Sequence, residues 1–153
     1  MTQKHQRPHG RDLRKGRVSL PGHVYLVTTV TWRRIPRFLD LRAARTVIHC
    51  LRNSDAAGRS RTLAYVLMPD HLHWLFQLGE ECHLSQVVGG VKSVSAHGMG
   101  TRIWQPGFHD HALRKDEDLR AMARYIVANP IRAGLVDRIG DYPHWDACWL
   151  WED

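Results

Sequence analysis

Two histidines separated by one leucine are the sharpest chemical feature of the chain. His71, Leu72 and His73 lie in a run rich in apolar and aromatic residues, which predicts a β-strand. Residues two apart on a strand point to the same face, so both imidazoles would project together. Neutral imidazole nitrogens can then bind one divalent metal jointly. The triplet alone leaves a second interpretation open, since two surface histidines with ordinary partners give the same pattern.

A tyrosine and an asparagine four residues apart form the second feature. Tyr125 lies in a predicted helix, and residues four apart on a helix are about 5–6 Å apart between Cβ atoms. The carboxamide oxygen of Asn129 would be placed to complete the protein ligands of a metal. Pro130 disfavours helical backbone at the residue before it, so we expect Asn129 at a kink or a helix break. Taken by itself, the pattern favours Tyr125 as a core aromatic.

The elements that position these residues follow from hydrophobic periodicity. Strands are predicted over residues 23–31, 62–68, 71–78 and 108–113, and helices over 40–54 with Asp40 as cap, 84–97, and from 116 through 125. Only Pro69 and Asp70 separate the second and third strands, which predicts a tight antiparallel hairpin. The order predicts an α+β fold, a ferredoxin-like antiparallel sheet with helices packed on one face.

The strand over residues 71–78 has two different faces. Leu72, Trp74, Phe76 and Leu78 alternate with the histidines, so one face is entirely apolar. We therefore expect the histidine face to be the outer, accessible one, where a substrate could bind.

Length and charge bound the kind of protein. The 153 residues fit one domain, with 22 Lys and Arg against 15 Asp and Glu and a net charge of +7. Such an excess of positive charge is typical of proteins that bind polyanions. Charge alone gives even odds that the ligand is a nucleic acid. Six basic residues fall within residues 1–22, which we interpret as a basic arm before one catalytic domain over residues 23–153.

Cysteine spacing and hydropathy indicate the compartment. Cys50, Cys82 and Cys148 are widely spaced and form no CxxC pair, so neither a disulfide framework nor a zinc ribbon is indicated. No run of 18 apolar residues and no apolar signal core occur. We expect a cytoplasmic protein with no membrane partner.

Three segments carry a family resemblance that covers nearly the whole chain, from about Gly16 to Trp149. MPDHLHWLFQL over 68–78, IWQPGFHDHALRKDEDLRAMARYIVANPIRAGLV over 103–136 and DYPHWDACW over 141–149 resemble the REP-associated tyrosine transposases. These are single-tyrosine, IS200-like transposases of the HUH nuclease superfamily, which is named for its His-hydrophobe-His motif. Three motifs in the right order are far more specific than the histidine pair alone.

The resemblance implies a set of roles. His71 and His73 would be paired ligands of Mg²⁺ or Mn²⁺, and Tyr125 the nucleophile that forms a 5′-phosphotyrosine and releases a 3′-hydroxyl. Asn129 stands where the wider superfamily usually has a glutamine as third ligand, so the shorter amide departs from that pattern. The implied function is a metal-dependent single-stranded DNA endonuclease and strand transferase, that is, a transposase. Its implied setting is the bacterial nucleoid.

The expected partner is single-stranded DNA with a hairpin of palindromic repeats. Lys92 and Arg114 are the best phosphate contacts by resemblance, and a base could stack on Trp104. Further candidates for phosphate neutralisation are Arg124, Arg132, Arg14 and Arg17. Both a monomer and a homodimer stay open.

Two alternatives stay open beside the transposase interpretation. One is a DNA-binding protein of the same fold that no longer cuts, although a binder has no need for His71, His73 and Tyr125 together. The other is a metal-dependent nuclease with water as nucleophile, for which Tyr125 would be dispensable.

Overall fold

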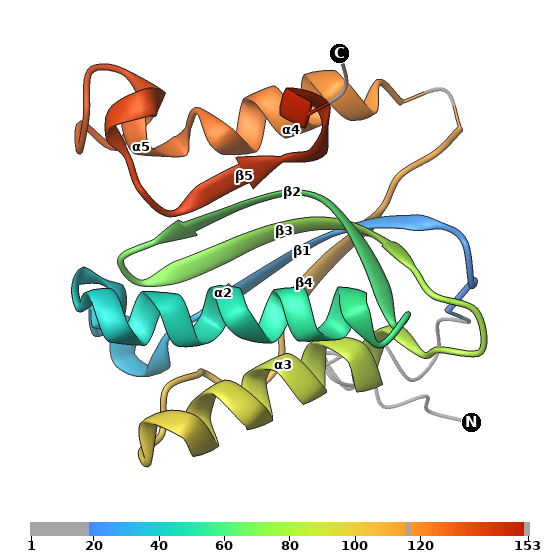
Figure 1. Ribbon diagram of the computed structural model, residues 1–153, viewed down its shortest axis with the longest axis horizontal. Helices are drawn as coiled ribbons and strands as arrows, with labels where there is room; N and C mark the ends of the chain where they lie inside the picture. Colours follow the sequence, from blue (N-terminus) through green and yellow to red (C-terminus); the bar gives the residue numbers. More distant parts are fainter. Residues whose placement is uncertain (1–18, 116, 152–153) are drawn as a thin grey trace, which may run out of the picture.

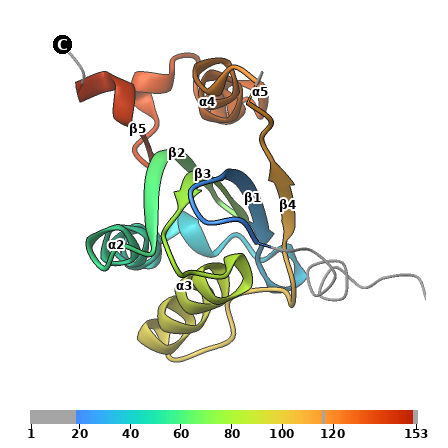
Figure 2. The same ribbon diagram turned by 90° about the vertical axis from the view of Figure 1, so that its right-hand side faces the viewer.

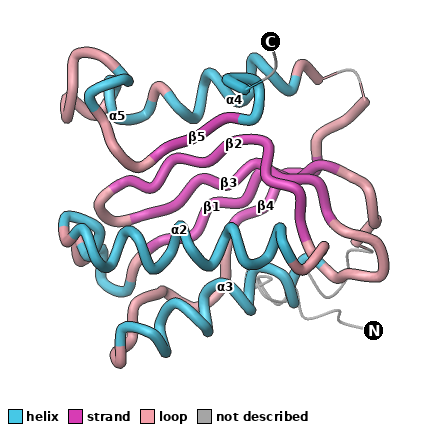
Figure 3. Tube along the Cα trace, viewed as in Figure 1, coloured by secondary structure: helices cyan, strands magenta, loops and turns pink. Residues whose placement is uncertain are grey.

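A computed structural model describes residues 19–115 and 117–151 of the chain. Five strands form one antiparallel sheet in the order β4-β1-β3-β2-β5 (Figure 3). The strands are β1 (Val24–Val30), β2 (Ser60–Met68), β3 (His71–Leu78), β4 (His109–Ala112) and β5 (Trp145–Ala147). The first four strands and the two long helices follow the predicted ferredoxin-like order, which confirms the α+β class.

Two long helices, α2 (Leu41–Ala56) and α3 (Leu84–Met99), cover one face of the sheet (Figure 1). That face is the apolar one, where Leu72, Trp74 and Phe76 form a core with buried side chains of both helices. Asp40 caps α2 as expected, because its carboxylate accepts from the N–H groups of Arg42 and Ala43 at 2.8 and 3.2 Å.

The remaining helices lie on the opposite face, which departs from the prediction that all helices share one face. The helices α4 (Leu119–Val127) and α5 (Asn129–Arg132) run along the other side of the sheet (Figure 2). Ala123, Ile126 and Val127 of α4 pack against apolar side chains of β2 and β3. The physical reason is that both sheet faces carry apolar residues, and burying one aliphatic side chain contributes about 1.5–3 kcal/mol.

Short 3₁₀ turns connect the larger elements. They are η1 (Trp32–Arg34), η2 (Arg37–Leu39), η3 (Ile139–Asp141) and η4 (Cys148–Trp151). Residues 19–22, placed in the basic arm by the sequence, are tied to the sheet: Gly22 N–H donates to the Leu78 carbonyl at 2.8 Å. The rest of the predicted arm lies outside the described residues.

The helices of the described part of the chain are too short or too polar to cross a membrane.

Candidate active site

The two histidines stand side by side on β3. The two-residue turn at Pro69 and Asp70 fixes the register of the β2–β3 hairpin, which pairs His71 with Met68 and His73 with Val66. The imidazole centroids are 4.8 Å apart with an interplanar angle of 88°. The structure therefore brings the two rings together on one face, as the i and i+2 spacing predicts.

Each imidazole is held through its Nδ1 atom. Asp70 Oδ1 lies 2.7 Å from His71 Nδ1, and Thr28 Oγ1 lies 2.8 Å from His73 Nδ1. A carboxylate can only accept a hydrogen bond, so Nδ1 of His71 is the donor in this contact, and the lone pair of the neutral ring lies on Nε2. Neither Nε2 atom has a hydrogen-bond partner among the described residues. A hydrogen-bonded Nδ1 behind a free Nε2 is how proteins orient metal-binding histidines.

His73 keeps its lone pair at neutral pH. Burial lowers the pKa of His73 to about 4, and the charges of His71 and Arg132 act in the same direction. A neutral imidazole is the form that ligates metal, so little proton competition opposes binding.

The histidine face is partly covered, which corrects the expectation of an open outer face. Leu75 shares that face with the histidines, and it packs with Ala64 and Val66 beneath Ile126 of α4. The His71 side chain is 20% exposed. The helix that carries Tyr125 thus lies over the sheet face that carries the histidine pair (Figure 1).

Tyr125 is on the outer part of α4 and is 63% exposed, which excludes a core role. The guanidinium of Arg132 lies 4.2 Å from its ring centroid, and Arg132 Nη2 donates to the Tyr125 carbonyl at 2.7 Å. The positive charge of the same guanidinium also contributes to the lowered pKa of His73, so Arg132 contacts the Tyr125 ring and acts electrostatically on the histidine.

Asn129 lies at the predicted helix break. The α4 helix ends at Val127, and α5 begins at Asn129 with Pro130 in its first turn. Asn129 Nδ2 donates to the Ile126 carbonyl at 2.8 Å, which leaves the amide oxygen as an acceptor. The α5 helix contacts β2, whose Val66 and Met68 flank the histidines.

The donor set fits a divalent ion that keeps open coordination positions. Among residues 19–115 and 117–151, no cluster of three or more His, Cys, Asp or Glu side chains has metal-binding geometry. Two imidazole nitrogens, together with the amide oxygen of Asn129 on a helix that contacts strand β2, would leave room for water and phosphate oxygens. Mg²⁺ and Mn²⁺ accept such oxygen ligands, and imidazole suits Mn²⁺ better than Mg²⁺.

Trp104 is not available to stack on a base, which corrects that prediction. It is only 6% exposed, packs against Phe38 with ring centroids 5.3 Å apart, and donates from Nε1 to Ser95 Oγ at 2.9 Å. It belongs to the core because Thr31 and Trp104 form a β-bridge that draws the loop inward.

The basic side chains proposed for DNA differ in their surroundings. Lys92 Nζ donates to the carbonyls of Gln105 and Gly107 at 2.8 and 2.5 Å, so it fastens the loop before β4. The Arg114 side chain is 80% exposed, with Nε 3.7 Å from Glu117 Oε1. Arg124 is exposed, and Arg14 and Arg17 lie outside the described residues.

Sequence reasoning missed Thr28 and Asp70. Asp70 directly precedes His71, which is a local signal that could have been used. Thr28 becomes visible only through strand pairing, because it lies 45 residues from His73 in the chain.

Comparison with known proteins places this chain in a family. A family model described as "Transposase IS200 like" matches residues 22–129, about two thirds of the chain. The chain belongs to the IS200-like transposase family. This IS200-like chain is 35% identical over 82 residues to the REP-associated tyrosine transposase of Escherichia coli (strain K12), covering 52% of this chain and 50% of that protein. A relative from Haemophilus influenzae is 30% identical over 99 residues, covering 54% and 56%.

A solved structure supports the same family. The IS200-like chain aligns with the "REP associates tyrosine transposase bound to a REP hairpin" with a TM-score of 0.74 and 27% identity, covering 84% of this chain and 79% of that one. The matched regions span about half the length of the two curated relatives.

Proposed function

We propose that this chain is a metal-dependent endonuclease and strand transferase for single-stranded DNA, with Tyr125 as its nucleophile. The observation that carries the proposal is the histidine pair, with both Nδ1 atoms held and both Nε2 atoms free, beneath the helix that bears an exposed tyrosine. Membership of the IS200-like family supports it.

His71, His73 and Asn129 would hold the Mg²⁺ or Mn²⁺ ion. When bound, such an ion polarises the scissile phosphate and stabilises the charge that develops on its oxygens. Asp70 and Thr28 keep the imidazoles in the orientation that presents Nε2. The low pKa of His73 keeps that nitrogen unprotonated at neutral pH.

Tyr125 would attack the phosphorus through its phenol oxygen. The bond from that oxygen to phosphorus forms as the phenol gives its proton to solvent, the bond from phosphorus to the 3′-oxygen breaks, and the departing 3′-oxygen takes up a proton from solvent. The products are a 5′-phosphotyrosine and a 3′-hydroxyl. Because the covalent link retains a phosphodiester, another 3′-hydroxyl can reverse the step and join strands. The Arg132 guanidinium, next to the Tyr125 ring, is placed to stabilise negative charge during the attack.

The proposed DNA is a single strand beside a hairpin of palindromic repeats. The structural relative is described as bound to a REP hairpin, which supports this choice. The net charge of +7 favours a polyanionic ligand.

The deciding experiment is a denaturing gel of purified protein mixed with labelled hairpin DNA and Mn²⁺. We expect a labelled band at the mass of the protein, lost in Tyr125→Phe and lost after chelation. The Tyr125→Phe change removes one exposed oxygen, so the variant should melt at the parent temperature. Cutting that persists in Tyr125→Phe would identify a water nucleophile. Binding without any cutting across many hairpins would identify a DNA-binding protein that does not cut.

A further inference from the structure

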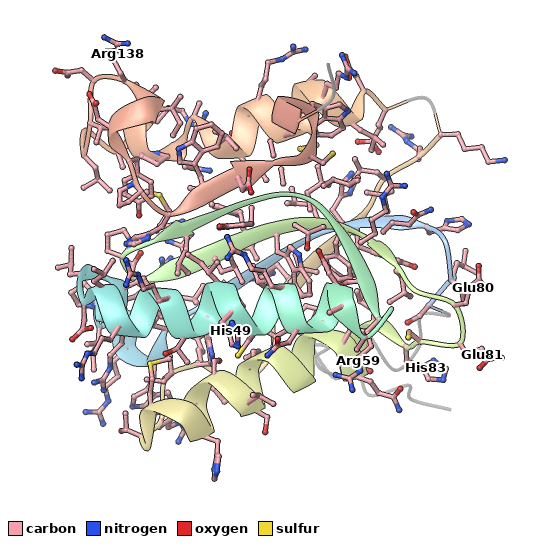
Figure 4. The ribbon with its side chains drawn as sticks, viewed as in Figure 1. His49, Arg59, Glu80, Glu81, His83 and Arg138 are labelled. Atoms are coloured by element: carbon pink, nitrogen blue, oxygen red, sulfur yellow. The ribbon has the colours of Figure 1, made fainter. Side chains whose placement is uncertain are left out.

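Two consecutive arginines after β1 have a backbone conformation that residues with a Cβ atom rarely adopt. Arg33 and Arg34, in η1, have φ values of 56° and 57°. This left-handed region is unfavourable outside glycine, and it persists only where the surrounding structure imposes it. Among the described residues, one further non-glycine residue has a positive φ. It is Glu81, with φ 61°, in the turn after β3 and at the other end of that strand from His71 (Figure 4).

The strained turn at η1 is fastened to the turn that precedes His71. Thr31 N–H donates to the Asp70 carbonyl at 2.9 Å, and Phe38 N–H donates to the Pro69 carbonyl at 3.0 Å. Thr31 is 0% exposed, and a hydrogen bond in a buried environment is stronger than one in water. The backbone on both sides of η1 therefore holds Pro69 and Asp70 in place.

The left-handed turn brings the Arg34 side chain to the Asp70 carboxylate. Arg34 Nη1 donates to Asp70 Oδ2 at 3.4 Å, while Asp70 Oδ1 lies 2.7 Å from His71 Nδ1. The carboxylate thus connects the guanidinium to the imidazole, with one oxygen for each. A carboxylate contacted at both oxygens is less free to rotate than one contacted at a single oxygen.

Stability does not explain this arrangement. The Arg34 side chain is 62% exposed and that of Asp70 31%, and ion pairs so open to solvent contribute little to the free energy of unfolding. The left-handed backbone opposes folding at the same residue. What the contact does achieve is to fix the carboxylate behind His71. A carboxylate in that position sets the tautomer and the ring orientation of a metal-binding histidine.

We propose that Arg34 is a positioning residue: through Asp70, it keeps the proton of His71 on Nδ1 and so presents Nε2 as the free nitrogen. This inference rests on the proposed function, in which the histidine pair holds the ion. The two histidines would then be oriented by different means. A neutral hydroxyl, that of Thr28, contacts His73, whereas an ion pair stands behind His71.

The variant Arg34→Gly separates positioning from the other effects of the arginine, because each effect has its own sign. Loss of a positive charge near the ion would by itself tighten Mn²⁺ binding. Relief of the left-handed backbone would by itself raise the melting temperature. Loss of positioning instead weakens Mn²⁺ binding. We therefore expect a variant that melts at or above the parent temperature yet binds Mn²⁺ about tenfold more weakly in isothermal titration.

Arg33→Gly is the matched control. It removes the same charge and relieves the same backbone conformation, but the Arg33 guanidinium lies over the Trp32 ring, 5.6 Å from its centroid. Its Mn²⁺ affinity should equal that of the parent. Arg34→Lys keeps a positive charge opposite Asp70 and should restore most of the affinity. In an Asp70→Ala background, Arg34→Gly should not weaken Mn²⁺ binding any further, because the carboxylate through which it acts is gone.

The tautomer of His71 provides a readout that needs no metal. The ¹⁵N chemical shifts of its two ring nitrogens, measured on the metal-free protein at about pH 8.5, where histidine side chains are neutral, report which nitrogen carries the proton. The parent and Arg33→Gly should carry it on Nδ1. In Arg34→Gly, part of the population should carry it on Nε2, where the proton blocks metal binding.

These measurements distinguish failure of this proposal from failure of the proposed function. An unchanged tautomer in Arg34→Gly, or Mn²⁺ binding as tight as that of the parent, would overturn the positioning role. The proposed function would survive that result if the parent forms the covalent band. An equal loss of affinity in Arg33→Gly would also overturn the positioning role. If the parent binds no Mn²⁺ yet the tautomer changes as expected, the proposed metal site fails and the role of Arg34 stands.

Discussion

At the scale of the residue, the hydroxyl of Thr28 is the contact most open to a clean test. It lies 2.8 Å from Nδ1 of His73 and on the same face of the sheet, so it orients the imidazole. Mutating a residue that hydrogen-bonds to a metal ligand commonly lowers metal affinity by about 10–100-fold.

Replacing Thr28 with valine should weaken Mn²⁺ binding by about 10–100-fold at nearly constant shape. Isothermal titration of Mn²⁺ into the purified protein measures this. The matched control is Thr29→Val on the other face of the same strand, because the Thr29 hydroxyl is buried without a partner among the described residues. That control should be neutral or slightly stabilising. Equal Mn²⁺ affinity in Thr28→Val and the parent would remove Thr28 from the site.

Sequence alone could predict the histidine pair at this scale, because strand alternation is a local rule. It could not predict Thr28 or the place of Arg132 over Tyr125, since both depend on contacts made by folding. Arg132 was expected on a DNA phosphate, whereas here it lies against the tyrosine ring.

At the scale of the element, local signals predicted the caps and the breaks. Asp40 caps α2, and the break between α4 and α5 lies at Ala128, with Pro130 in the first turn of α5, where a missing N–H costs no helical hydrogen bond. The three-residue strand β5 was missed because so short a run carries no periodicity. The face chosen by α4 was missed because it depends on Leu75, which the alternation placed among polar neighbours.

Trp104 is a large aromatic side chain buried between the elements of the core. Trp104→Ala should lower the free energy of unfolding by about 3–5 kcal/mol, since it removes a large buried ring. The salt slope of DNA binding should not change. Urea denaturation gives the first quantity and a salt titration the second. A reduced slope with unchanged stability would restore Trp104 as a DNA contact.

At the scale of the whole molecule, stability depends on pH through two buried histidines. Burial lowers the pKa of His73 from 6.5 to about 4, and it lowers that of His144 with a contribution from Arg45. Between pH 6.5 and about 4, the unfolded chain therefore binds more protons than the folded one. Stability is lost as pH falls through this window and is retained above it.

His73→Gln should make this pH dependence shallower. With about 1.4 kcal/mol per pKa unit, His73 accounts for a loss of up to about 3 kcal/mol by pH 4. Urea denaturation at pH 7.5 and pH 4.5 gives the loss of stability between the two pH values for parent and variant. Subtracting one loss from the other removes the contributions of all groups that the two proteins share. Parallel curves for the two proteins would show that His73 does not carry this linkage.

The sheet order itself could be predicted only by analogy with the ferredoxin-like arrangement. The pairing of β1 with β3 joins segments that lie far apart in the chain. The pairing of β2 with β3 joins segments that are neighbours in the chain. Only the second has a local signal, the two-residue turn at Pro69 and Asp70.

The lengths of the outer strands bear on aggregation. The edges of the sheet are β4 and β5, with four and three residues, whereas the strands between them have seven to nine. A long apolar strand at an edge offers unpaired backbone groups to a second chain. Because β5 pairs with Ala64, Tyr65 and Val66, it occupies that side of β2. The segment around Trp145 therefore shields part of a largely buried, apolar strand from intermolecular pairing, and losing it would favour insoluble assemblies.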